Sequence, residues 1–126
     1  MDFRENAFNQ FYEYYISTNT SKDALIENHT ELSNNQSIRY KQLVVNTLEN
    51  LETIILFVSE SSTNWTFERI MSVEKVCLIL GIAELSMKLT KKEVVISEWV
   101  KIADQHGTKS GAKFVNGVLE DVYTKL

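Results

Sequence analysis

The fold is decided by two neighbouring stretches, VVISEWVKIADQHG at residues 94–107 and KFVNGVL at residues 113–119. In the first, apolar residues recur three and four positions apart, which places them on one face of a helix: Val95, Ile96, Trp99, Ile102 and Ala103. Gly107 follows where a left-handed residue closes a helix, because glycine has no Cβ to clash there. The second stretch begins another apolar stripe: Phe114, Val115, Val118, Leu119, Val122 and Leu126. Together they predict a helical hairpin.

The segment before this hairpin predicts a buried central helix. Residues 76–83 form an unbroken apolar run, so a helix here should be buried on every side. Ser72 is expected to cap its start, and Glu74 in the first turn suits the helix dipole. Further upstream, residues 38–60 carry a heptad-like stripe that predicts one long helix: Val44, Leu48, Leu51, Ile55 and Val58. The stripe would also suit a coiled-coil dimer, although it covers fewer than four heptads.

The first third of the chain predicts two shorter helices. Residues 3–16 place aromatic and apolar side chains at helical spacing, and Asp2 stands where a capping residue belongs. Residues 17–21 read as a turn whose last two residues are both candidate caps for a second helix ending near residue 29. The polar run at residues 33–37 is expected to be a loop.

Composition predicts a single all-α domain that spans residues 1–126. With 44% hydrophobic and 24% charged residues, the chain has the composition of a globular protein. It has no proline and only 4 glycines, so it lacks the turn-forming residues that strand-and-turn folds usually contain. We expect six or seven helices. The single Cys77 cannot form an internal disulfide, which fits the reducing cytoplasm. No apolar run approaches the ~20 residues that span a bilayer, so no membrane is expected.

Nothing in the sequence predicts catalysis, a cofactor or a metal site. Two histidines and one cysteine match no zinc-binding spacing. The run GTKSG at residues 107–111 lacks the strand before it that a phosphate-binding loop requires. The adjacent carboxylates Glu120 and Asp121 point to different sides of a helix, as solvated charges do.

Two motifs carry a resemblance to a known family. The hairpin has the form V-x-I-x-E-x-x-x-x-A-x-x-x-G followed by K-F-V-N-G-V-L, in which Asn116-Gly117 is a pair that helix propensity alone would not select. Upstream, the chain matches W-x-x-x-R-x-x-x-V-[DE]-[RK]-x-x-L-x-x-x-x-x-E-L at Trp65, Arg69, Val73, Glu74, Lys75, Leu78, Glu84 and Leu85. Both patterns resemble the NusB family of bacterial transcription antitermination factors.

This resemblance implies a fold, a function and a set of partners. The fold would be two small helical bundles packed together, and the function would be transcription antitermination and ribosomal RNA synthesis, without enzymatic activity. The implied partners are single-stranded boxA-type RNA, the small-subunit ribosomal protein NusE, and the RNA polymerase antitermination complex. A homodimer is left open.

The resemblance also implies roles for individual residues. Tyr12 and Glu74 match positions that face the protein partner. The RNA surface is implied at or beside Arg4, Glu68, Lys113, Phe114 and Asn116. Structural roles stay open beside these: Tyr12 could flank the aromatic core, Glu74 could be only a first-turn charge, and Phe114 could be core.

The chain also departs from the family pattern. Arg4-Glu5-Asn6-Ala7 keeps the end of the family's opening motif, but the arginine cluster before it is missing, and Ser110 stands where the family often has Asp. The net charge is −4, whereas RNA affinity comes mostly from Lys and Arg. Three alternatives follow: a NusB-like scaffold that has lost RNA binding, a stand-alone relative of the helical RNA-binding domain of ribosomal RNA cytosine methyltransferases, and a helical adaptor with only generic similarity.

Overall fold

The computed structural model describes residues 2–62 and 66–126, and over these ranges it contains helices and no strands. The seven α-helices are α1 (Phe3–Phe11), α2 (Lys22–Glu27), α3 (Asn34–Glu49), α4 (Leu51–Ser61), α5 (Ser72–Met87), α6 (Lys92–His106) and α7 (Lys109–Tyr123). A π-helical turn (Tyr12–Ile16) extends α1, and a 3₁₀ turn (Phe67–Arg69) precedes α5. The all-α prediction is confirmed. Of the helices described, none has the length and apolar character needed to cross a membrane.

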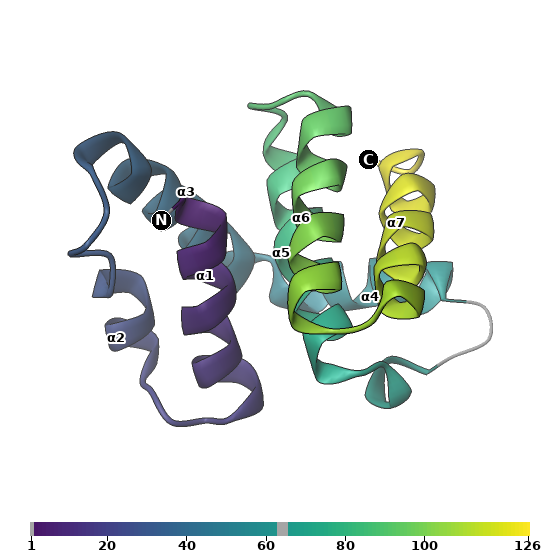
Figure 1. The fold of residues 1–126 in the computed structure, drawn as a ribbon, viewed down its shortest axis with the longest axis horizontal. Helices are drawn as coiled ribbons and strands as arrows, with labels where there is room; N and C mark the ends of the chain where they lie inside the picture. The colour runs from purple at the N-terminus through teal and green to yellow at the C-terminus, as the bar shows by residue number, and fades with distance from the viewer. Residues whose placement is uncertain (1, 63–65) are drawn as a thin grey trace.

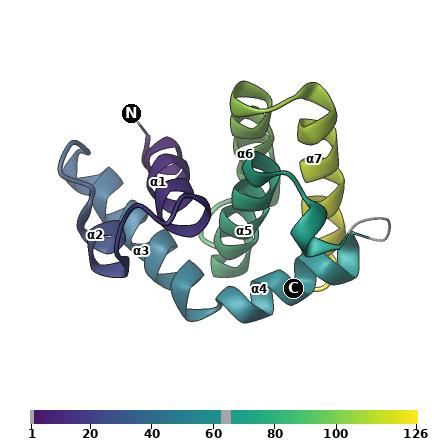
Figure 2. The same cartoon turned by 90° about the horizontal axis from the view of Figure 1, so that it is seen from below.

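The helices form two groups that lie side by side (Figure 1). One group consists of α1, α2 and α3, and the other of α5, α6 and α7. Helix α4 continues from α3 and packs against α5 and α7, as the view from below shows (Figure 2). This arrangement agrees with the two packed bundles that the family resemblance implies.

Helix α5 is the centre of the core. Every residue from Val76 to Leu85 is buried, because this helix packs against α3, α4, α6 and α7. A helix surrounded in this way has no solvent face, which is why its sequence is apolar all round rather than amphipathic. The prediction of a buried central helix is confirmed.

A buried polar cluster on α5 joins the two helix groups. The Glu84 carboxylate accepts hydrogen bonds from Arg4 Nε at 2.8 Å, from Arg4 Nη2 at 2.7 Å and from Trp99 Nε1 at 2.9 Å. Burial alone would lower the pKa of Arg4, but the hydrogen bond and charge of Glu84 outweigh it and raise that pKa above its ordinary value. Arg4 therefore lies inside the fold, not on the RNA surface predicted for it.

The predicted helix over residues 38–60 is wrong, because it breaks into α3 and α4 at Asn50. This residue leaves the helical conformation (φ −120°, ψ 17°), and its side-chain Nδ2 donates to the Asn46 carbonyl at 2.9 Å. Asparagine competes with helical hydrogen bonding in this way. The bend changes which positions face the core, so Leu48 and Leu51 of the predicted stripe are only partly buried.

Some of the predicted helix starts are correct and others are wrong. Asp2 and Ser21 cap α1 and α2 as predicted, each accepting from backbone N–H groups. The predicted loop at residues 33–37 is wrong, because the Ser33 hydroxyl accepts from the backbone N–H of Gln36 at 3.4 Å and starts α3 immediately. Ser72 is the first residue of α5, and no side chain caps that helix.

Candidate functional site

The candidate site lies at the corner where α6 turns into α7 against the start of α5. Gly107 closes α6 by donating its N–H to the Ala103 carbonyl at 2.9 Å. Its φ is −126°, so the predicted left-handed cap is wrong. Glycine is needed for packing instead, since a Cβ would lie 3.0 Å from the Ala103 oxygen and 3.2 Å from Val73 Cγ1.

Thr108 and Gly111 position the first turn of α7. The Thr108 hydroxyl accepts from the Gly111 N–H at 2.9 Å and caps the helix. A Cβ on Gly111 would lie 1.9 Å from Oε1 of Glu74, so glycine is what allows this carboxylate to lie against α7. The start of a helix carries partial positive charge, which favours a carboxylate there. Glu74 is accordingly held as a buried acid at the corner.

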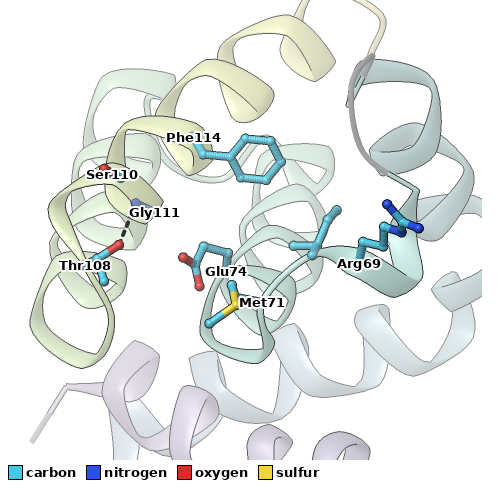
Figure 3. Close-up of a pocket in the computed structure, with 8 residues that line it drawn as sticks. Arg69, Met71, Glu74, Thr108, Ser110, Gly111 and Phe114 are labelled. Carbon is cyan, nitrogen blue, oxygen red and sulfur yellow. Dashed lines mark hydrogen bonds between the residues drawn. The ribbon is translucent and has the colours of Figure 1, made fainter.

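A cavity of about 310 Å³ opens beside Glu74 (Figure 3). Its walls are Arg69, Ile70, Met71, Glu74, Thr108, Ser110, Gly111 and Phe114. Thr108, Ser110 and Gly111 lie on one side and Arg69 on the other, with the Phe114 ring and Glu74 between them. An aromatic ring can stack a base, a carboxylate can accept base N–H groups, and a guanidinium can bind phosphate. The cavity thus offers the chemistry of a nucleotide or of a partner's polar side chain.

A second cavity, of about 440 Å³, lies on the α1 side of the start of α5. Phe8, Asn9, Gln10, Tyr12, Glu13, Val73 and His106 line it. His106 stacks on Phe8 with ring centroids 4.6 Å apart, and its Nε2 is 3.4 Å from Oε2 of Glu5. Because Val73 and Glu74 are consecutive, the two cavities flank the first turn of α5. Tyr12 and Glu74, predicted to face one partner, thus line neighbouring cavities.

The structure brings together some of the predicted RNA-surface residues and separates others. Lys113 and Asn116 are exposed on α7, and the partly buried Phe114 lines the first cavity, which neither of the other two lines. Glu68 is exposed on the 3₁₀ turn and does not line this cavity. Burial raises the pKa of Tyr15, and the charge of Glu68 adds to this rise. The candidate surface is therefore the first half of α7 with the cavity beside it.

Several residues that line the site were not predicted from the sequence, among them Thr108, Arg69 and Met71. Thr108 three residues before Gly111 is a recognisable cap position, so this signal was available. Arg69 was recognised only as part of a family pattern. Met71, which is 70% exposed at the cavity rim, gave no signal because burial cannot be inferred for a lone apolar residue in a turn.

Comparison with known proteins identifies the family. The family model described as the NusB family matches residues 1–124. The transcription antitermination protein NusB of Borreliella burgdorferi is 32% identical over 122 residues, which cover 90% of this chain and 86% of that protein. The chain belongs to the NusB family of transcription antitermination factors.

Solved structures agree on the fold. T. maritima NusB superimposes with a TM-score of 0.87 at 25% identity, covering 98% of this chain and 89% of that one. A chain from the crystal structure of the antitermination factors NusB and NusE in complex with dsRNA has a TM-score of 0.85 at 23% identity, covering 98% of this chain and 95% of that one.

Trp65, part of the upstream family pattern, lies outside the described residues.

Proposed function

We propose that this protein is a transcription antitermination and ribosomal RNA synthesis factor that binds boxA-type single-stranded RNA together with NusE in the cytoplasm. Family membership supports the role, and a structural neighbour contains NusB with NusE and double-stranded RNA. The observation that carries the proposal for this chain is the placement of Lys113, Phe114 and Asn116 on the first half of α7, where Phe114 lines an open cavity and the other two are exposed. Assembly into the RNA polymerase antitermination complex belongs to the same proposal.

Each residue of this grouping has a distinct role towards RNA. Phe114 stacks a splayed base, an interaction that contributes about 1–3 kcal/mol per base. The exposed ammonium of Lys113 neutralises a phosphate, and the amide of Asn116 reads a base edge or the 2′-hydroxyl. Glu74, at the floor of the cavity, accepts N–H groups from the base or from the partner.

The protein partner supplies the positive charge that this chain lacks. With a net charge of −4, the chain binds RNA weakly on its own. The cavity lined by Tyr12 also contains Glu13, and Glu5 lies near its edge beside His106. These carboxylates favour a basic partner. The partner surface and the RNA surface meet at the start of α5, so one RNA strand can contact both proteins.

The test is a fluorescence-anisotropy titration of a boxA-type RNA by this chain, by NusE and by the mixture, each at several salt concentrations. We expect the mixture to bind more tightly than either protein and with the steepest salt dependence. Phe114→Ala and Lys113→Gln should weaken binding by the mixture, whereas Lys22→Gln, a matched change on α2, should not. A mixture that binds RNA no better than NusE alone contradicts the proposal.

One observation favours a second candidate function. The only basic residue of the first helix, Arg4, is buried against Glu84, so the first helix offers no cation to RNA. A NusB-like scaffold that holds the protein partner without binding RNA would have this property. In the same titration, a complex that forms but adds nothing to RNA affinity identifies the scaffold.

A further inference from the structure

A second charged surface lies at the opposite end of α5 from the candidate site. The turn between α5 and α6 has the sequence KLTKK at residues 88–92, which we call the lysine turn. With Leu85 and Tyr123 it lines a cavity of about 310 Å³. This lining includes three lysines and no carboxylate, in a chain whose net charge is −4. Such a surface attracts an anion.

The lysine turn is held in place by specific contacts. Lys88 ends α5 in the left-handed conformation (φ 55°, ψ 32°) and donates its N–H to the Leu85 carbonyl at 3.3 Å. Arg39 of α3 donates to the Thr90 hydroxyl at 2.9 Å. A side chain other than glycine is disfavoured in the left-handed conformation. The chain therefore keeps a lysine where backbone geometry favours glycine, which points to a use for that side chain.

Two of the three lysines are available to a ligand. Lys92 binds Glu120 at 3.2 Å and lies over the Tyr123 ring, 5.2 Å from its centroid. Lys88 and Lys91 are exposed, and over residues 2–62 and 66–126 neither forms an ion pair. Leu89, which is 65% exposed, adds an apolar contact beside them.

A continuous strip of α7 links the lysine turn to the candidate site. Lys113, Asn116, Glu120 and Tyr123 are spaced three and four apart and are all exposed, so they share one outer face of the helix. From Lys113 to Tyr123 this face is about 15 Å long. Glu120, the acid on this strip, has its charge offset by Lys92. A strand that contacts Lys113 and Asn116 can therefore follow this face of α7 without meeting an unpaired carboxylate on it.

We propose that the lysine turn is a second, sequence-independent binding site for the backbone of single-stranded RNA that extends beyond the segment bound at the first half of α7. Lys88 and Lys91 neutralise phosphates, and Leu89 and Tyr123 contact sugar or base. This inference rests on the proposed function, because it takes the strand to be RNA held at the first half of α7. Each phosphate contact on a single strand contributes about 0.7 to the slope of log affinity against log salt.

The test compares a short RNA limited to the boxA-type segment with a long RNA carrying single-stranded extensions at both ends, in the presence of NusE. For the long RNA, Lys88→Gln/Lys91→Gln should make the salt slope shallower by about 1.4 and weaken binding on the order of tenfold at 0.15 M salt. The short RNA should be unaffected. The control Lys22→Gln/Lys41→Gln removes the same charge from α2 and α3 and should change neither RNA.

A single variant separates binding from folding. Lys88→Gly relieves the left-handed conformation and should raise the melting temperature by about 4 °C. It should nevertheless weaken long-RNA binding about fourfold, because one phosphate contact is lost. A more stable variant with unchanged long-RNA affinity overturns the inference.

The outcomes distinguish this inference from the proposed function. If Phe114→Ala weakens short-RNA binding but Lys88→Gln/Lys91→Gln leaves the long-RNA slope unchanged, the proposed function stands and the inference is wrong. In that case the lysine turn would instead bind an acidic protein segment. If the wild-type protein with NusE binds neither RNA more tightly than NusE alone does, both the proposed function and this inference are wrong.

Discussion

Replacing Arg4 with methionine should destabilise the protein by about 3–5 kcal/mol, because it leaves the buried carboxylate of Glu84 without its charged partner. The Arg4 and Glu84 side chains are 7% and 2% exposed, and two hydrogen bonds of 2.8 and 2.7 Å join them. Methionine fills similar volume, so the loss reflects electrostatics more than packing. Only Trp99 Nε1 and the more distant Arg39, at 3.8 Å, would still contact the carboxylate.

A double-mutant cycle with Glu84→Met isolates this pair. The double variant removes both charges together, so it should recover most of the stability that Arg4→Met loses. Urea unfolding followed by circular dichroism measures both, and Arg4→Met should lower the midpoint by about 2–3 M. The matched control is Lys101→Met, which breaks an exposed ion pair with Glu98 of 3.0 Å and should cost less than about 1 kcal/mol.

The result that would refute this reasoning is a loss below about 1 kcal/mol in Arg4→Met, equal to the surface control. Arg4 would then not hold the two helix groups together. If the same variant also lowered RNA affinity at full stability, the original prediction of an RNA contact at Arg4 would be right instead.

Three further predictions concern single sites. Gly117→Ala should stabilise α7 by up to about 1 kcal/mol, since beyond its chain neighbours and the nearby backbone of α7 nothing lies within 4 Å of the new Cβ. Gly111→Ala should instead cost about 1 kcal/mol or more, because the Glu74 carboxylate must move. Thermal unfolding compares the two variants. Asp2→Ala should cost about 1 kcal/mol in urea unfolding through loss of the α1 cap. Cys77 should resist a maleimide at pH 8 until the protein unfolds, because burial raises the pKa of its thiol, and labelling at the rate of free cysteine would contradict its burial.

The elements that could be predicted from the sequence are those whose packing follows from the local pattern of apolar residues. The hairpin of α6 and α7 followed from apolar residues three and four positions apart, because each of these helices packs on one continuous face. The buried α5 followed from its unbroken apolar run. The caps at Asp2 and Ser21 followed because a capping side chain acts within three residues of itself. Local chemistry was sufficient in these cases.

The elements that could not be predicted depend on contacts between distant segments. The stripe from Val44 to Val58 fits one helix, but the chain bends at Asn50, and after the bend α4 packs on α5 and α7. Arg4 looks like a surface cation until Glu84, eighty positions away, is placed beside it. Gly111 has no visible purpose in the sequence, since its reason is the position of Glu74 on another helix. Of the residues predicted for the RNA surface, Lys113, Phe114 and Asn116 lie on α7, whereas Arg4 and Glu68 lie on other segments.

The central claim, that the first half of α7 contacts RNA, is tested most directly by photo-cross-linking a boxA-type RNA carrying 4-thiouridine to the complex with NusE and mapping the cross-linked peptides by mass spectrometry. We expect cross-links on the peptide that contains Lys113, Phe114 and Asn116, and their loss in Phe114→Ala. Cross-links confined to NusE, or to segments of this chain outside α7 and the lysine turn, would contradict it.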